Sequence, residues 1–158
     1  MTPIGAIEAS VLGLAMRDSP WLSAVVKAVH LSGIAMLAGS IALLDLRLLG
    51  LRRTVPVRRL AGRVLPWTAA SFLFIVPSGL AMFVARAGEL IASPVFAAKI
   101  CLILAACANA GIFHAGVYRS AAHWDVEVMP PVAARTAAGL SLALWVSAFT
   151  CGRLLANS

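Results

Sequence analysis

Two histidines lie inside long apolar stretches of this chain and are the side chains best suited to chemistry. His30 lies within the stretch 21–44, and His114 lies within the stretch 95–118. An imidazole in hydrocarbon costs several kcal/mol unless a metal, a cofactor, a partner side chain or water accompanies it. We therefore take His30 as the first candidate for cofactor or metal binding and His114 as the second.

Two cationic side chains extend the candidate site around His30. Lys27 precedes His30 by about one helical turn, and Arg153 lies near the end of the last apolar stretch, which should return to the same membrane face. Both can neutralise acidic groups such as the propionates of haem. The predicted cofactor-binding residues are thus His30, Arg153, Lys27 and His114, with His30 as the metal ligand. No catalytic residue is predicted.

The depths of the two histidines disfavour one haem held between them. At 1.5 Å per residue, His30 lies roughly 5 Å beyond Lys27, whereas His114 lies about 22 Å beyond Lys99 on a span of the same direction. Two axial ligands of one haem must meet at nearly one depth. We therefore expect b-type haem ligated by His30 near the outer face, with any second histidine coming from another subunit. His114 is expected beside Asp45 at the inner face.

Three other polar positions are expected to have structural roles. Asp45 and Arg47 end the first apolar stretch and are predicted to pair with each other at the interface. Asn109 lies in the middle of the third stretch and should make a hydrogen bond between helices. His123 lies in a polar connection and is expected to be solvated.

The elements that position these residues are predicted to be membrane-spanning helices. The chain has 158 residues, of which 61% are hydrophobic and 12% charged, and its mean hydropathy is +0.95. Four apolar stretches each supply the roughly 20 residues that cross a bilayer. They are residues 22–46, 66–85, 95–118 and 134–156. We expect an all-α, integral membrane four-helix bundle, forming a single transmembrane domain over residues 1–158.

The segment before the first span is too short to cross a membrane. Its apolar residues recur at helical spacing between residues 3 and 17. This pattern predicts an N-terminal amphipathic helix lying at the membrane interface. Within the second span, Pro77, Ser78 and Gly79 predict a kink or local unwinding.

We attribute the net charge of +7 to membrane topology rather than to nucleic-acid binding. Of the thirteen Lys and Arg residues, eight fall on the side of the bundle that carries the connections between spans one and two and between spans three and four. Six of these lie between residues 47 and 63. The positive-inside rule then places this side in the cytoplasm and both termini in the periplasm. The lipid bilayer is the expected partner, and no nucleic acid is expected.

A motif near the end of the first span carries a resemblance. The letters HLSG at 30–33 and LLDLRLLG at 43–50 resemble the hallmark of a family of small bacterial inner-membrane proteins of unknown function. More distantly, residues 96–99 and Asn109 are similar to the membrane region of copper-resistance D-type proteins. The resemblance covers nearly the whole chain. It implies a four-helix protein of the bacterial inner membrane and brings no established activity.

Two classes of function remain open at this point. The first is a redox or cofactor-binding membrane protein that carries b-type haem for electron transfer near the periplasmic face. The alternative is a non-catalytic subunit, as a homo-oligomer or within a larger membrane complex, or a copper-handling accessory protein. Copper would be the cofactor of the latter, and a purely structural subunit would have none. The sequence lacks paired intramembrane carboxylates and a nucleophile–base motif, and it leaves open whether the protein is an enzyme.

Overall fold

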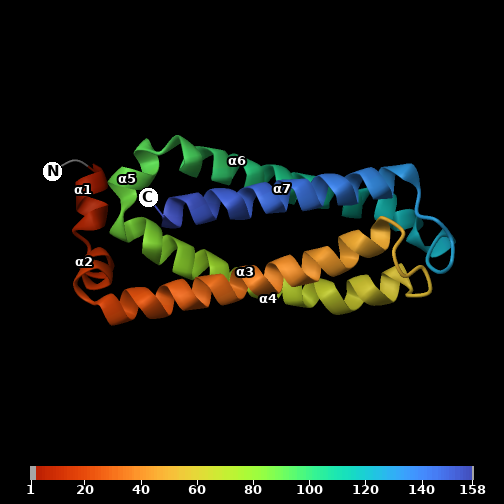
Figure 1. The fold of residues 1–158 in the computed structure, drawn as a ribbon, viewed down its shortest axis with the longest axis horizontal. Helices are drawn as coiled ribbons and strands as arrows, with labels where there is room; N and C mark the ends of the chain where they lie inside the picture. Colours follow the sequence, from red (N-terminus) through yellow and green to blue (C-terminus); the bar gives the residue numbers. More distant parts are fainter. Residues whose placement is uncertain (1–2, 158) are drawn as a thin grey trace.

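Two helical hairpins lie side by side along the length of the molecule (Figure 1). The structure is a computed structural model and describes residues 3–157. The first hairpin pairs α3 (Pro20–Leu48) with α4 (Val57–Ala85), and the second pairs α6 (Pro94–Ala115) with α7 (Val132–Ala156). Within the described residues, these four helices are long and apolar enough to cross a membrane. The predicted all-α bundle is confirmed, and the chain is a multi-pass membrane protein.

The two ends of the bundle differ in their secondary structure. One end, called here the short-helix end, carries α1 (Pro3–Glu8), α2 (Val11–Asp18) and α5 (Ala87–Ala92), together with both ends of the described chain (Figure 1). The other, called the loop end, carries residues 49–56 and the 3₁₀ helix η1 (Val117–His123). Residues 3 and 157 thus share one end of the bundle, as an even number of spans requires.

The hairpins are held by close packing at different levels. Gly33 of α3 lies so near α4 that a Cβ there would be 2.8 Å from Cγ1 of Ile75. In the middle, Leu37, Ala106 and Trp145 form an apolar cluster that joins the two hairpins. Helix α3 packs closely on α7, whereas α4 and α6 lie further apart and meet through side chains, as in the stacked rings of Phe83 and Phe96. The hairpins therefore meet mainly along α3 and α7.

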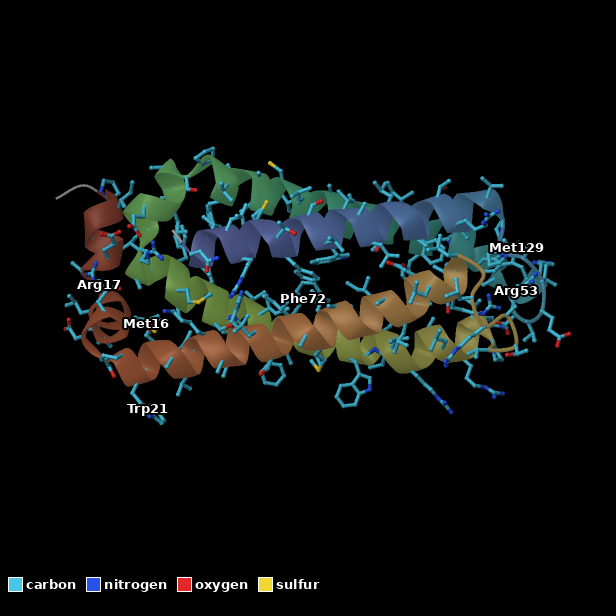
Figure 2. The ribbon with its side chains drawn as sticks, in the orientation of Figure 1. Met16, Arg17, Trp21, Arg53, Phe72 and Met129 are labelled. Atoms are coloured by element: carbon cyan, nitrogen blue, oxygen red, sulfur yellow. The ribbon has the colours of Figure 1, made fainter. Side chains whose placement is uncertain are left out.

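The N-terminal segment departs from the predicted single helix 3–17. It forms two short helices, because Ser10 interrupts the first and caps the second by accepting a hydrogen bond from Gly13 N at 3.2 Å. Met16 packs on the α4 residues Ala81 and Ala85. Val11, in contrast, is 87% exposed. This segment lies across the short-helix end, where Figure 2 shows Met16 and Arg17. It packs on the bundle as expected, whereas the predicted single continuous helix was wrong.

The start of the second span was also predicted incorrectly. Helix α4 begins at Val57, nine residues before the expected 66. Two hydrogen bonds to Asp125 stabilise this start, since its carbonyl accepts from Val57 N at 3.1 Å and its Oδ1 accepts from Arg58 N at 2.8 Å. Val57 and Ala61 are fully buried in the loop-end cluster with Trp124. Tertiary contacts thus extend the helix beyond its apolar stretch.

The structure also differs from the sequence-based expectation at the end of the third span and at Pro77 in the second. Helix α6 ends at Ala115 rather than at 118, and the 3₁₀ helix follows it. Helix α4 continues through Pro77 without local unwinding. Ser78 contributes to this continuity, because its hydroxyl donates to the carbonyl of Phe74 and also lies 3.2 Å from the carbonyl of Ile75. Such side chains satisfy carbonyls that a proline leaves unpaired.

Candidate functional site

His30 lies between α3 and α4, in the half of the bundle nearer the short-helix end. Its side chain is buried, and Nδ1 lies 3.1 Å from the carbonyl oxygen of Ile75 and 2.9 Å from Oγ of Ser78. Because a carbonyl can only accept, Nδ1 carries the proton and Nε2 is the bare nitrogen. A Cβ on Gly79 would lie 3.2 Å from Cε1 of the ring. Gly79 therefore makes room for the imidazole.

The cation that the structure brings to His30 is Lys99. It comes from α6, it interacts electrostatically with His30, and its Nζ lies 3.6 Å from where a Cβ of Gly152 would be. Lys99 therefore reaches from α6 towards both α3 and α7. Lys27 and Arg153, the cations predicted for this site, have exposed side chains. The sequence placed Lys99 at the correct depth but did not select it.

His114 belongs to a different site, a partly open cavity lined by all four spanning helices. The cavity has a volume of about 240 Å³ and lies in the half of the bundle nearer the loop end. Its wall is mostly apolar, and Figure 2 shows Phe72 pointing from α4 into the space between the hairpins. Asp45 of α3, His114 of α6 and Ser141 of α7 bring polar atoms to it. The predicted proximity of Asp45 and His114 is confirmed to the extent that both side chains line this cavity.

Asp45 is the most unusual residue of the cavity. It is only 6% exposed, and its carboxylate interacts with the hydroxyl of Ser141. Its Oδ2 atom is buried and has no hydrogen-bond partner among residues 3–157. A buried carboxylate oxygen without a donor is unfavourable by about 1–3 kcal/mol or more. The fold therefore holds an unsatisfied acceptor on a residue of the cavity wall.

His114, in the wall of the same cavity, has a second buried atom without a partner. Its Nδ1 lies 2.8 Å from the carbonyl oxygen of Ala110, so Nδ1 carries the proton. Nε2 is then an acceptor, and it is buried without a partner in the described part of the chain. The rings of Phe113 and Tyr118 pack on the imidazole at centroid distances of 5.1 and 5.2 Å. The imidazole ring is thus fixed by its neighbours, while its Nε2 atom accepts no hydrogen bond from the described residues.

Asn109 lines the cavity and joins two helices. Its Nδ2 donates to the carbonyl oxygen of Ala137 at 2.9 Å, which confirms the predicted hydrogen bond between helices. A donated amide hydrogen leaves the side-chain carbonyl oxygen as an acceptor. The cavity wall thus has acceptors at Asp45 and His114, whereas Asn109 keeps both its carbonyl oxygen and its second N–H.

Arg47 does not pair with Asp45, contrary to the prediction. Its guanidinium, 2% exposed, donates to the carbonyl oxygens of Val55 at 2.7 Å, Arg53 at 3.2 Å and Asp125 at 3.0 Å. Arg47 is directed towards the loops, whereas Asp45 is directed into the bundle. The reason is helical geometry, because side chains separated by two positions, such as Asp45 and Arg47, point about 200° apart around a helix.

With this geometry established, the family of the chain can be stated. A family of unknown function, DUF6644, matches residues 6–158. The chain belongs to this family. The resemblance to small membrane proteins of unknown function is thereby supported, whereas nothing in the comparisons supports a relation to copper-resistance proteins. No curated protein and no solved structure matches this DUF6644 chain.

The conspicuous motif of this DUF6644 protein, LLDLRLLG at 43–50, now has a structural explanation. Leu44 and Leu48 are buried in the loop-end cluster. Asp45 lines the cavity and Arg47 binds the loops. Gly50 has a φ of +103°, a left-handed conformation that favours glycine. The motif thus combines four structural roles at the end of α3: core packing, cavity lining, hydrogen bonding to the loops and a left-handed turn.

The side-chain partners of His30 and Asp45 were missed in the sequence. Ser78 was visible only as part of a helix-breaking triplet, and Ser141 is one of many small residues in α7. The roles of these two serines depend on which helices pack against each other in the bundle.

His123, predicted to be solvated, is exposed, and its Nδ1 lies 3.2 Å from the carbonyl oxygen of Ser120. Among residues 3–157, no group of three His, Cys, Asp or Glu side chains is arranged to hold a metal ion.

Proposed function

We propose that this protein binds a small organic ligand within the membrane, in the cavity that Asp45 and His114 line. The observation that carries the proposal is Asp45, which lines a cavity of about 240 Å³ and whose buried Oδ2 atom has no partner among the described residues. An apolar cavity with a few convergent polar groups is the usual form of a small-molecule site. A ligand that donates a hydrogen bond would satisfy Asp45 and His114 together.

A structural role explains this arrangement less well. A residue that only holds helices together would use its hydrogen-bonding atoms on the neighbouring helix, as Asn109 does with Ala137. Asp45 and His114, like Arg47 at its Nη1 atom, each leave one buried atom unsatisfied in the described structure, but only Asp45 and His114 belong to the cavity wall. Ionisable groups inside spans commonly mark the pathways of ligands, ions or protons. Binding is therefore the function that the geometry favours.

The test compares two substitutions on one helix. Ala110 lines the cavity and is exposed at its rim, so Ala110→Phe should obstruct the site without overpacking the core. Ala108→Phe, on an exposed position of α6 outside the cavity wall, is the matched control. Each protein is purified from its native membrane, and its extractable small molecules are quantified by mass spectrometry. We expect one compound near unit stoichiometry in the wild type and in Ala108→Phe, and its loss in Ala110→Phe; equal contents in all three would refute the proposal.

A second candidate function is b-type haem binding for electron transfer, with His30 as an axial ligand. One observation favours it. The Nδ1 proton of His30 is bound by the Ile75 carbonyl, and this arrangement is typical of imidazoles that ligate a metal through Nε2. Lys99 would be the nearest cation for a propionate. The ring is only 8% exposed, so the haem would have to displace neighbouring side chains.

An optical spectrum tests the haem candidate directly. Protein expressed with ample haem should show a Soret band that His30→Ala abolishes and that His123→Ala, at an exposed histidine, leaves unchanged. A wild type without a Soret band would eliminate the candidate. Metal analysis of the same samples tests the copper-handling alternative, in which copper near unit stoichiometry would disappear in His30→Ala. Protein that holds neither ligand, haem nor copper would favour a non-catalytic subunit of a homo-oligomer or a larger complex.

We further propose that the protein lies in a bacterial inner membrane with its loop end in the cytoplasm. The support is the charge distribution, because eight of the thirteen Lys and Arg residues belong to the loop end or to the helix segments next to it. Under this orientation both ends of the chain lie in the periplasm. The Asp45 cavity would then lie nearer the cytoplasm and His30 nearer the periplasm.

A further inference from the structure

We infer that the ligand of the Asp45 cavity is a small organic cation, an ammonium group attached to an apolar body. The inference rests on the proposed function and specifies the chemistry of its ligand. It depends on three features of the cavity wall: its charge, the direction of its hydrogen bonds and its aromatic surface.

The charge of the wall is carried by Asp45 alone among the acidic and basic side chains that line it. Helices α4 and α7 contribute apolar and hydroxyl side chains, and α6 contributes two further titratable groups, His114 and the thiol of Cys107. The nearest arginine in sequence, Arg47, gives its guanidinium to three carbonyl groups at the loop end. In the described structure, the carboxylate thus lacks a cationic partner. A buried charge is strongly unfavourable unless it is paired, and a cationic ligand would supply the pair.

The hydrogen-bonding atoms around the cavity point to the same chemistry. Oδ2 of Asp45 and Nε2 of His114 are both acceptors when the carboxylate is ionised and the imidazole neutral. Asn109 gives one N–H to the carbonyl of Ala137 and keeps its carbonyl oxygen and one N–H, so it contributes an acceptor and a donor. A ligand that brings only acceptors, such as an anion or a ketone, would add to the imbalance. A ligand that brings N–H donors removes it.

Aromatic side chains complete the site. Phe72 of α4, Phe113 of α6 and Trp145 of α7 all belong to the cavity wall. The faces of such rings attract cations, and the attraction increases where water is excluded. A carboxylate combined with aromatic rings is therefore suited to an ammonium ion. The volume of about 240 Å³ admits a ligand built on a single ring, since a cavity of roughly 150 Å³ accommodates benzene.

The test uses two probes of nearly equal size and shape, benzylammonium and benzyl alcohol. They differ only in whether the head group is a charged ammonium or a neutral hydroxyl, and both donate hydrogen bonds. Binding of each probe to the full-length protein in lipid nanodiscs is measured by isothermal titration calorimetry at neutral pH. The same titrations are made with Asp45→Asn, which keeps the shape of the side chain and removes its charge. Thermal unfolding of both proteins shows whether the variant is folded.

We expect the wild type to bind benzylammonium at least about tenfold more tightly than benzyl alcohol, because the ion pair forms in a partly buried site. Asp45→Asn should abolish this preference. Equal affinities in the wild type would overturn the inference even if the variant failed to fold, and so would a preference that survives in Asp45→Asn. Binding of benzyl alcohol alone would overturn the cationic ligand while leaving the proposed cavity function in place. If neither probe bound, the cationic ligand would again be wrong, and the co-purification experiment would decide separately whether the cavity holds a ligand.

Discussion

Arg47 shows how a single buried side chain can organise one end of a membrane protein. Its planar guanidinium reaches carbonyl groups of residues 53, 55 and 125, which lie on the two connections at the loop end. Lysine has one compact ammonium group and cannot reproduce this forked geometry. The positive charge of Arg47 thus serves the structure locally in addition to any role in membrane orientation.

We expect Arg47→Lys to destabilise the protein while the same change at an exposed arginine does not. A hydrogen bond that involves a charged group contributes about 1.5–3 kcal/mol, so the loss of one or two should lower the midpoint of thermal unfolding by several degrees. The measurement is thermal unfolding in detergent, and Arg52→Lys, at an exposed position of the same loop, is the control. Equal midpoints for the two variants would show that the carbonyl contacts contribute little.

The contact between His30 and Ser78 permits a second measurement at the scale of residues. Their hydrogen bond of 2.9 Å crosses from α3 to α4 in a buried position. Such bonds within membranes contribute roughly 0.6 kcal/mol on average and up to about 1.7 kcal/mol. In a double-mutant cycle of His30→Ala and Ser78→Ala, we expect a coupling energy of unfolding of about that size. Strictly additive effects of the two substitutions would contradict this contact.

At the scale of elements, the α3–α4 hairpin depends on one close approach between helices. A Cβ at Gly33 would lie 2.8 Å from Cγ1 of Ile75, 3.0 Å from Cβ of Phe74 and 3.3 Å from the main-chain nitrogen of Ile75. Gly39, six residues further along α3, has no such atom within 4 Å. The two glycines therefore differ in packing although they share one helix.

We expect Gly33→Ala to destabilise the protein by about 1–3 kcal/mol, because the added methyl group forces α3 and α4 apart. Gly39→Ala should have no such cost and should stabilise the helix by up to about 1 kcal/mol, since alanine has the higher helix propensity. Unfolding in a denaturing detergent measures both free energies. If both variants gained stability, the close approach of the two helices would be wrong.

At the scale of the whole molecule, the distribution of positive charge predicts how the bundle lies in its membrane. The first and last described residues lie at the short-helix end, and the arginine-rich connections lie at the other (Figure 1). Retaining Arg side chains in the cytoplasm is favourable. A reporter that is active only in the periplasm, fused after Ser158, should therefore be active, and a reporter active only in the cytoplasm should be silent. The opposite result would invert the orientation and place the Asp45 cavity nearer the periplasm.

The sequence by itself determined the class of fold and the position of most helices. Four apolar stretches with a mean hydropathy of +0.95 for the chain have no other stable arrangement than helices across a bilayer, because every main-chain group must be hydrogen-bonded there. Depth followed from the rise of a helix, which correctly separated His30 from His114 and placed the latter at the level of Asp45, with which it shares a cavity wall. Boundaries were less accurate where tertiary contacts extended a helix, as Asp125 does for α4.

Only the tertiary structure decided what each polar residue contacts. Rotation around a helix axis and the choice of neighbouring helix are set by packing across the whole bundle, and sequence spacing on one helix does not contain them. For this reason the predicted Asp45–Arg47 pair was wrong, and Lys99 rather than Lys27 or Arg153 approaches His30. The cavity itself exists because four helices enclose a space that no local pattern specifies. Its unsatisfied carboxylate oxygen, which carries the proposed function, becomes visible only when every neighbour is in place.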